Sequence, residues 1–414
     1  MQPTADRRRR ALLAALPAAC LCPTQLWAQS SAAWLADIDA FLRELRARHL
    51  APFEITPAAQ IEAAAERVRQ HVQAGRDALI AAAFQEMVGL VGDFHTQVNL
   101  PELQTPRLPL VLRRYAEGWF VVRVAPGWEE WLGRRIYSLA DLAVDAVQDA
   151  CRGLAAYPLS AEFEALFERV LQGSGSVLAY CSLLTEGQVA LGWSPGLAKV
   201  YSEALVPLLS TSPSVDEVTA GLRPALISER QASRNYYAEP LPNAQAVYFG
   251  YRRCVSDPAY PPSRFSSDLL ALAREVNAQS VLIDLRGNGG GDSALLNALL
   301  AGVSGDAAIR RAQAFVLTDA RTQSSALMNA HVLRSEAGAI SVGSIPGTAL
   351  NHLGEVRSLS LPSGRTMFYS TRRFNLAPQD PRGRAAAFQI DRPVQARWLD
   401  AQLGLDTLVE SAIV

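Results

Sequence analysis

Short apolar runs alternate with amphipathic stretches through the second half of the chain. Residues 247–251, 281–284 and 314–317 are compact apolar runs, each long enough for one buried strand. Between them, residues 269–276 and 295–303 repeat leucine, alanine and valine at the three- and four-residue spacing of a helix. Strands separated by helices require crossover connections, so we predict an α/β sheet over residues 241–414.

The chain from residue 30 to residue 240 has a different pattern. Residues 33–90 carry apolar stripes at helical spacing, which predicts a helical region over residues 30–100. Residues 105–150 then show alternating strands around a glycine turn, followed by an amphipathic helix. We predict a small PDZ-like or β-rich module there, with a packing subdomain that has no ligand groove as the alternative. Residues 151–240 form a connecting region.

Residues 1–29 have the pattern of an export signal. A cluster of arginines at 7–10 precedes the apolar residues 11–22, which are too few to span a bilayer, and Ala28 offers a small residue for cleavage. We therefore expect an exported, periplasmic protein. Export could follow the general or the twin-arginine route, and lipoprotein anchoring at Cys20 is the less favoured alternative because Pro17 disagrees with the usual pattern. No later stretch is expected to span the membrane.

Composition narrows the possible partners. The chain has 414 residues, 49% of them hydrophobic, and a formal net charge of −1. This balance gives no basic field of the kind that nucleic-acid binding requires, so we expect no such partner. Cys151, Cys181 and Cys254 remain after the signal; one pair could oxidise, but their wide spacing argues against a metal site, and we expect no cofactor.

Candidate catalytic residues follow two of the apolar runs, residues 281–284 and 314–317. Residues 281–284 lead into a loop with glycines at 287 and 289–291, whose backbone can approach a ligand closely. Residues 314–317 lead into residues 322–326, which contain two serines at the head of a helical stretch. A serine at such a turn, beside free backbone N–H groups, is the arrangement that acyl transfer needs.

These segments resemble the core of the tail-specific, or C-terminal processing, serine proteases. The family pattern D-L-R-x-N-x-G-G is matched by residues 284–290, its L-T by 317–318, and its S-A-A/S-E by 324–326. The resemblance also includes residues 92–96, 343–355 and 369–371. It implies a ClpP/crotonase-like α/β core with an N-terminal helical cap, a peptide or protein substrate, and hydrolysis of peptide bonds.

The resemblance also implies which group acts as the base. Processing proteases use a lysine in a segment matched here by residues 343–349, which contain none. In the branch resembling the tricorn protease core and interphotoreceptor retinoid-binding protein, the base is a histidine, matched by His95 in Gly92-Asp93-Phe94-His95-Thr96. A lone histidine is more often structural, but this context favours His95 as the base.

The remaining site residues follow from the same motifs. Ser324 is the expected nucleophile, with Ser325 as the alternative. The expected oxyanion donors are the N–H groups of Gly289, Gly290 and Ser325, while Asp284 and Arg286 are expected to form a structural pair. Because the tricorn-like branch takes its orienting carboxylate from the C-terminal part, the resemblance implies Asp380 for this role, with Glu355 as the alternative.

One departure from the family leaves a second function open. Leu327 stands where the family usually has glutamate. Together with the missing lysine and with Phe94 in a usual glycine position, it motivates the alternative of an inactive homologue that binds peptide or lipid. An esterase that acts on small acyl substrates would use the same residues.

Overall fold

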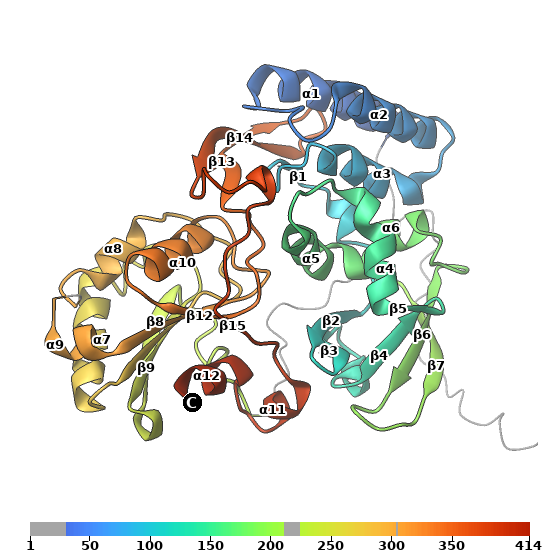
Figure 1. Cartoon of the computed structure of the whole chain (residues 1–414). Helices are drawn as coiled ribbons and strands as arrows, with labels where there is room; N and C mark the ends of the chain where they lie inside the picture. The colour runs from blue at the N-terminus through green and yellow to red at the C-terminus, as the bar shows by residue number, and fades with distance from the viewer. Residues whose placement is uncertain (1–29, 211–223, 304) are drawn as a thin grey trace, which may run out of the picture.

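The computed structural model describes residues 30–210, 224–303 and 305–414, so the expected signal segment lies outside the described residues. Several sheets and their covering helices form the described chain (Figure 1). The predicted α/β class is therefore confirmed.

A mainly parallel sheet organises the second half of the chain, as the apolar runs predict. Its strands run in the order β15-β12-β11-β10-β9-β8, and only β8 is antiparallel to its neighbour. They are β8 (Tyr236–Leu241), β9 (Ala246–Tyr251), β10 (Ser280–Asp284), β11 (Gln313–Thr318), β12 (Ile340–Gly343) and β15 (Arg392–Pro393).

Both faces of this sheet are covered, which explains why its central strands are apolar throughout. Val281 and Ile283 of β10 pack in one core, whereas Leu282 between them packs in another, as the two-residue period of a strand requires. The first core is closed by α7 (Pro262–Glu275), α8 (Leu295–Leu300) and α10 (Ser325–Ser335), and the second by α12 (Thr407–Ile413). The short helix α9 (Ala307–Arg311) lies beside α7, and α11 (Trp398–Gln402) packs its Trp398 against Tyr115 and Phe120 of the N-terminal half.

The N-terminal part combines a helical layer with a second sheet. The helical layer is the predicted one and consists of α1 (Ser31–Arg48), α2 (Ala58–Gln73) and α3 (Asp77–Gly89). The sheet has the order β2-β3-β4-β6-β7, with β5 beside β4. Its strands are β2 (Leu110–Tyr115), β3 (Gly118–Val124), β4 (Arg135–Leu139), β5 (Leu142–Ala143), β6 (Gln188–Ser194) and β7 (Ser202–Pro207).

This second sheet is larger than the module expected over residues 105–150. Strands β6 and β7 come from the expected connecting region, residues 151–240, which also supplies two of the three helices beside the sheet. These helices are α4 (Val144–Ala150), α5 (Ser160–Arg169) and α6 (Gly175–Tyr180). Residues far apart in the sequence therefore build one module.

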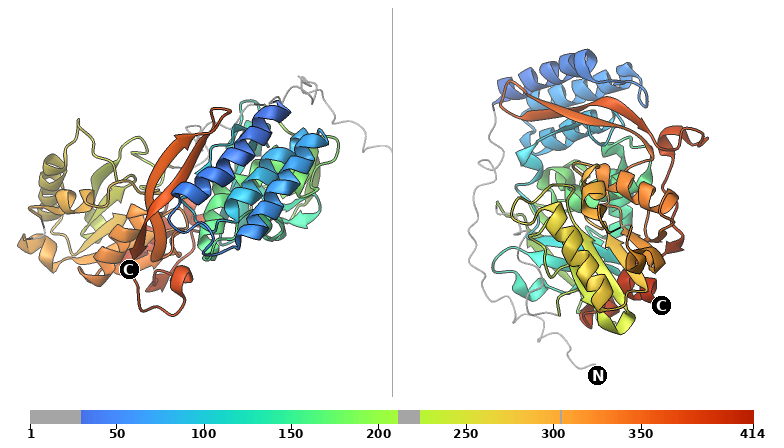
Figure 2. Two further views of the ribbon diagram at one scale, coloured as in Figure 1. Left: turned by 90° about the horizontal axis from the view of Figure 1, so that it is seen from above. Right: turned by 90° about the vertical axis from the view of Figure 1, so that its left-hand side faces the viewer.

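A long hairpin connects the two halves of the molecule. Strands β13 (Asn351–Ser360) and β14 (Thr366–Asn375) leave the parallel sheet, and β14 pairs with β1 (Gln97–Val98). Figure 2 shows the hairpin running between the N-terminal helices and the parallel sheet. Its turn is held by Arg365, whose guanidinium pairs with buried Asp37 at 2.8 Å and lies 3.6 Å from the centre of the Trp34 ring. The hairpin thus brings the segment around His95 to the C-terminal half.

Candidate active site

The candidate nucleophile lies in a strained turn between β11 and α10. Ser324 has φ 52° and ψ −125°, a conformation that a residue with a side chain adopts at a cost of about 1–3 kcal/mol. Its N–H donates to Thr348 Oγ1 at 3.0 Å, and its carbonyl accepts from the Met328 N–H at 3.1 Å. The Ser324 hydroxyl caps no helical N–H and is partly exposed. The backbone is fixed while the hydroxyl stays available.

The glycine loop packs directly against this turn. Gly290 has φ 101°, and a Cβ there would lie 2.8 Å from the Cβ of Ser324 and 3.0 Å from the Ser325 nitrogen. Only glycine permits so close an approach. Two hydrogen bonds fix the contact: Ser325 Oγ donates to the Gly291 carbonyl at 2.6 Å, and the Gln323 N–H donates to the Asn288 carbonyl at 2.9 Å.

The three expected oxyanion donors differ in availability. The N–H groups of Ser325, the first residue of α10, and of Gly289 have no acceptor among the described residues. The N–H of Gly290 donates to the Asn288 side chain at 2.9 Å. Two of the expected donors are therefore free, and the third is engaged within its own loop.

Ion pairs below the loop support it, as expected for Asp284 and Arg286. The Arg286 guanidinium binds the Asp284 carboxylate and also Asp406, which precedes α12, with nitrogen–oxygen distances of 2.5 and 2.8 Å. Tyr248 donates to Asp284 at 2.6 Å from the neighbouring strand. The predicted structural pair is confirmed, and Asp406 is an additional member.

The candidate base lies in a buried turn after α3. The His95 side chain is 10% exposed, and neither of its ring nitrogens has a hydrogen-bond partner among the described residues. Its ring lies against Phe94 and His352, with centroid distances of 5.7 and 5.8 Å. Burial lowers the pKa of His95, and the Asp93 carboxylate partly opposes this shift. A lowered pKa favours the neutral imidazole that a general base requires.

A carboxylate close to His95 is held by several donors. His49 Nδ1 accepts from the Ala51 N–H, so the proton on Nε2 donates to Asp93 Oδ2 at 3.1 Å. Thr96 Oγ1 donates to the same oxygen at 2.6 Å, and Asp93 Oδ1 lies 3.9 Å from His95 Nδ1. Burial would raise the pKa of Asp93, but the His49 hydrogen bond and the His95 and Thr96 contacts hold it at about 2. Asp93 is therefore a buried anion.

Ser324 and His95 are connected through residues 348–352, which precede and begin β13. Thr348 accepts from the Ser324 N–H, and the Ala349 carbonyl lies 2.7 Å from Nδ1 of His352, whose ring stacks on that of His95. No described hydrogen bond joins Ser324 Oγ to His95 itself. Ser324 and His95 therefore both contact residues 348–352. Catalysis requires their side chains to meet in the substrate complex.

Helix α5 closes the same region from the N-terminal half. Ala349 packs against Leu159 and Ala161, and the Ala349 N–H donates to buried Glu162 at 3.3 Å. Burial raises the pKa of Glu162 to about 8. A protonatable carboxyl group therefore lies beside the segment that joins Ser324 and His95.

Other expected residues lie elsewhere. Asp380 forms an ion pair with Arg382 at 2.6 Å, and no described contact joins it to His95. Glu355 is exposed at φ 53° within β13, where the pairing with β14 keeps the same register on both sides. Leu327 is fully buried in the core on one face of the parallel sheet. Lys199 is the one lysine of the sequence and is exposed between β6 and β7, far along the chain from Ser324.

Sequence reasoning missed His49, Thr348 and Glu162. His49 and Asp93 lie 44 positions apart, and no sequence motif includes both residues or indicates their hydrogen bond. Glu162 had a local signal, since it stands at the third position of α5, where a carboxylate can bond the N–H before the helix. Its contact with Ala349 depends on tertiary packing alone.

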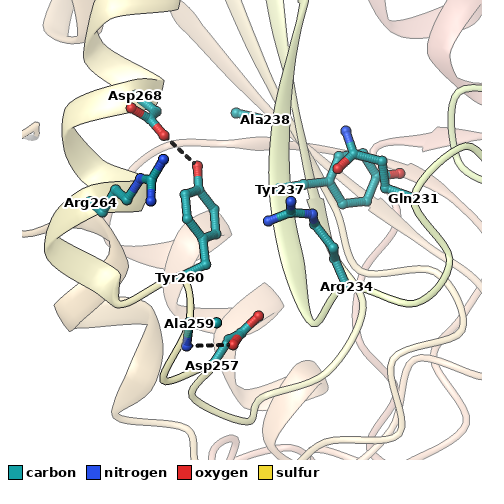
Figure 3. A pocket seen from close by; sticks show the side chains of 9 residues that line it. All are labelled: Gln231, Arg234, Tyr237, Ala238, Asp257, Ala259, Tyr260, Arg264 and Asp268. Carbon is teal, nitrogen blue, oxygen red and sulfur yellow. Dashed lines mark hydrogen bonds between the residues drawn. The ribbon is translucent and has the colours of Figure 1, made fainter.

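A separate polar pocket lies at the edge of the parallel sheet. It has a volume of about 430 Å³ and is lined by residues of β8, α7 and the loops beside them (Figure 3). Arg234 and Arg264 lie over the Tyr260 ring, whose hydroxyl donates to Asp268 at 2.9 Å. Neither Ser324 nor His95 lines this pocket.

The described residues contain no group of three or more histidine, cysteine, aspartate or glutamate side chains arranged to hold a metal ion. Within the same residues, no helix has both the length and the apolar character needed to cross a membrane.

Comparison with solved structures establishes the fold. The chain matches no protein-family model, and no curated protein is similar to it in sequence. The structure of mature CPAF complexed with lactacystin is similar with a TM-score of 0.60 at 12% identity, over 90% of this chain and 95% of that one. Another structure of mature CPAF has a TM-score of 0.56 at 12% identity, over 92% and 95%. The photosystem II D1 C-terminal processing protease follows with a TM-score of 0.39 at 12% identity, over 89% and 94%, a likeness too weak to support an argument. At such identities the comparison shows that this chain shares the CPAF fold over nearly its whole described length.

Proposed function

We propose that this protein is an exported serine peptidase that hydrolyses peptide bonds through an acyl-enzyme on Ser324. The observation that carries the proposal is the strained Ser324 turn, which holds a free hydroxyl beside the glycine loop and the N-terminus of α10. Backbone strain of this size persists where the surroundings impose it, and it concentrates at functional sites. The motif resemblance and the fold shared with CPAF support the same activity.

In the proposed reaction His95 acts first as a base and then as an acid. Neutral His95 takes the proton of the Ser324 hydroxyl as its oxygen attacks the peptide carbonyl carbon, and the N–H groups of Ser325 and Gly289 stabilise the oxyanion. Gly290 joins them if Asn288 releases its N–H. The imidazolium then protonates the leaving amine, and a water activated by His95 hydrolyses the acyl-enzyme.

The orienting carboxylate has three candidates, Asp380, its alternative Glu355 and Asp93. Asp380 is the residue expected from the sequence, but its carboxylate pairs with Arg382. Asp93 is favoured by its 3.9 Å approach to His95 Nδ1 and by its lowered pKa, which keep a negative charge beside the imidazolium that forms. Replacing the orienting residue by asparagine should slow hydrolysis by several orders of magnitude, and the same change at the other aspartate should have little effect.

Two finer assignments belong to the same proposal. The branch whose base is a histidine is favoured because Lys199, the one lysine, is exposed in a turn between β6 and β7. Export to the periplasm rests on residues 1–29, whose pattern is that of a cleaved signal.

An inactive homologue that binds peptide or lipid is the second candidate. It is favoured by one specific observation, the lack of a described hydrogen bond between Ser324 Oγ and the buried, unpartnered ring of His95. A binding protein would keep the fold without this bond.

Hydrolysis of a library of unstructured peptides, followed by mass spectrometry of the products, tests the proposal. The full chain should cleave peptides, and Ser324→Ala should lose at least about 1,000-fold in rate with an unchanged circular dichroism spectrum. The matched Ser325→Ala keeps its backbone N–H but loses the hydroxyl bond to Gly291, so its rate should fall far less. Unchanged turnover in Ser324→Ala would eliminate the assignment. A native chain that cleaves no peptide, yet binds members of the library, would support the inactive homologue.

A further inference from the structure

Two of the cysteines in the N-terminal half lie close together. Cys151 follows α4 at the start of a 3-10 turn, Cys151–Leu154, and Cys181 follows the last residue of α6. Their sulfur atoms are 3.6 Å apart, although the residues are 30 positions apart in the sequence. Cys254, by contrast, lies in the other half of the molecule, buried beside Asn288 and Asn329. Among the described cysteines, only this pair is in contact.

We propose that Cys151 and Cys181 form a structural disulfide when the folded protein meets a disulfide oxidant. The bond requires the sulfur atoms to approach to about 2.05 Å. Both residues lie at helix ends, where side-chain rotation and a small backbone shift can supply this movement. Cys181 has a φ of −84° and ψ of 7° and is followed by Ser182 at φ 58°, so the chain leaves the helix in a turn at this point.

The two thiols are unequal, which suits stepwise exchange. Cys181 is partly exposed, whereas Cys151 is 1% exposed. The interaction between the two thiols lowers the pKa of Cys181, and the same interaction together with burial raises the pKa of Cys151. The accessible thiol is therefore also the one that ionises more readily, as an attacking thiolate must.

The exchange balances with an external disulfide such as oxidised glutathione. The Cys181 thiolate attacks one sulfur of the oxidant, whose S–S bond breaks and releases a thiolate, leaving a mixed disulfide on Cys181. Cys151 then loses its proton and attacks the Cys181 sulfur, which releases the second thiol. The protein loses two electrons and two protons, and the oxidant becomes two thiols.

This bond would link the turn after α4 to the end of α6, two segments that pack on α3, the helix before His95. The turn after Cys151 packs on the end of α3, where a Cβ on Gly89 would lie 2.1 Å from the Leu154 carbonyl oxygen, and the Ala156 N–H donates to Gly89. On the other side, Ser176 of α6 accepts from the Ala82 N–H of α3 at 3.0 Å. Helix α3 leads directly into the His95 turn, so the disulfide would close a ring of contacts around its end.

Peptide mapping tests the inference without any knowledge of the substrate. The purified full chain, carrying Cys20→Ser and Cys22→Ser so that three cysteines remain, is incubated with oxidised glutathione. Its remaining thiols are then alkylated in denaturant, and it is digested with trypsin without reduction. We expect a cross-linked pair of the peptides 136–152 and 170–199, lighter by two hydrogen atoms than the separate peptides, and an alkylated Cys254 in the peptide 254–264.

Matched variants separate this bond from adventitious oxidation. Cys254→Ser should retain the cross-link, and Cys181→Ser should abolish it without recruiting Cys254. Reduction should raise the unfolding equilibrium constant of the oxidised native chain by roughly 30- to 1,000-fold and leave that of Cys181→Ser unchanged. Three alkylated thiols after oxidation, a lasting glutathione adduct on Cys181, or a cross-link that includes Cys254 would each overturn the inference.

Discussion

The strain at Ser324 predicts an unusual order of stability among substitutions. Glycine adopts φ 52° and ψ −125° freely, whereas alanine retains the strain, which is worth about 1–3 kcal/mol. Glycine also has a more flexible unfolded chain, which costs about 0.5–1 kcal/mol. Because the Ser324 side chain caps no helical N–H, alanine loses no capping bond. Ser324→Gly should therefore be more stable than Ser324→Ala by about 1 kcal/mol.

Urea unfolding of the two variants, followed by tryptophan fluorescence, measures this difference. The neighbouring Ser325 provides the matched control, since it is the first residue of α10 and has a helical conformation. There Ser325→Gly should be less stable than Ser325→Ala by up to about 1 kcal/mol. If glycine at position 324 were equally or less stable than alanine, the strain inferred for the turn would be refuted.

Three further predictions concern the surroundings of the site. Gly290→Ala should lower the rate of peptide hydrolysis sharply and destabilise the fold, because the new Cβ would lie 2.8 Å from that of Ser324. Hydrolysis at the wild-type rate would contradict this close approach. The folded state holds the Glu162 proton up to a pKa of about 8, so stability should fall as pH rises from about 4.5 to 8, by at most about 1.4 kcal/mol per unit. Glu162→Gln should remove this dependence in urea titrations at several pH values, and an unchanged slope would show that the carboxyl is not buried in solution. Arg365→Met should cost about 3–5 kcal/mol in thermal or urea unfolding, because it leaves the buried Asp37 carboxylate unpaired; a loss below about 1 kcal/mol would mean that the pair is solvated.

The parallel sheet was predictable because its signals are local. The apolar runs at 281–284 and 314–317 match β10 and β11, and the glycine loop and serine turn follow these strands as their residue types require. The stripe at 295–303 overestimates α8, which ends at Leu300. Propensity alone does not place the end of a short helix.

The hairpin and the second sheet were harder to predict from the sequence because their strands pair with segments far away along the chain. Nothing in residues 97–98 indicates that they pair with residues 367–368, and β6 joins β4 across about fifty intervening residues. Such register is decided by packing across the whole molecule.

The candidate site shows the same division between local and distant signals. The motifs around Ser324 and His95 are local in the sequence and made both residues predictable. The hydrogen bonds from His49 to Asp93 and from Ala349 to Glu162 connect separate elements. The first bond helps to keep Asp93 charged, whereas burial raises the pKa of Glu162, and no pattern along the chain indicates either contact.

Labelling with a fluorophosphonate most directly tests the claim that Ser324 is an activated nucleophile, because such reagents modify serines that an adjacent base activates. The tryptic peptide 322–334 contains both serines, and fragment ions distinguish a phosphonyl group on one from that on the other. We predict a single adduct on Ser324 that persists in Ser325→Ala and is lost in Ser324→Ala and in His95→Gln. An unlabelled native protein, or an adduct that survives the loss of His95, would contradict the proposed mechanism.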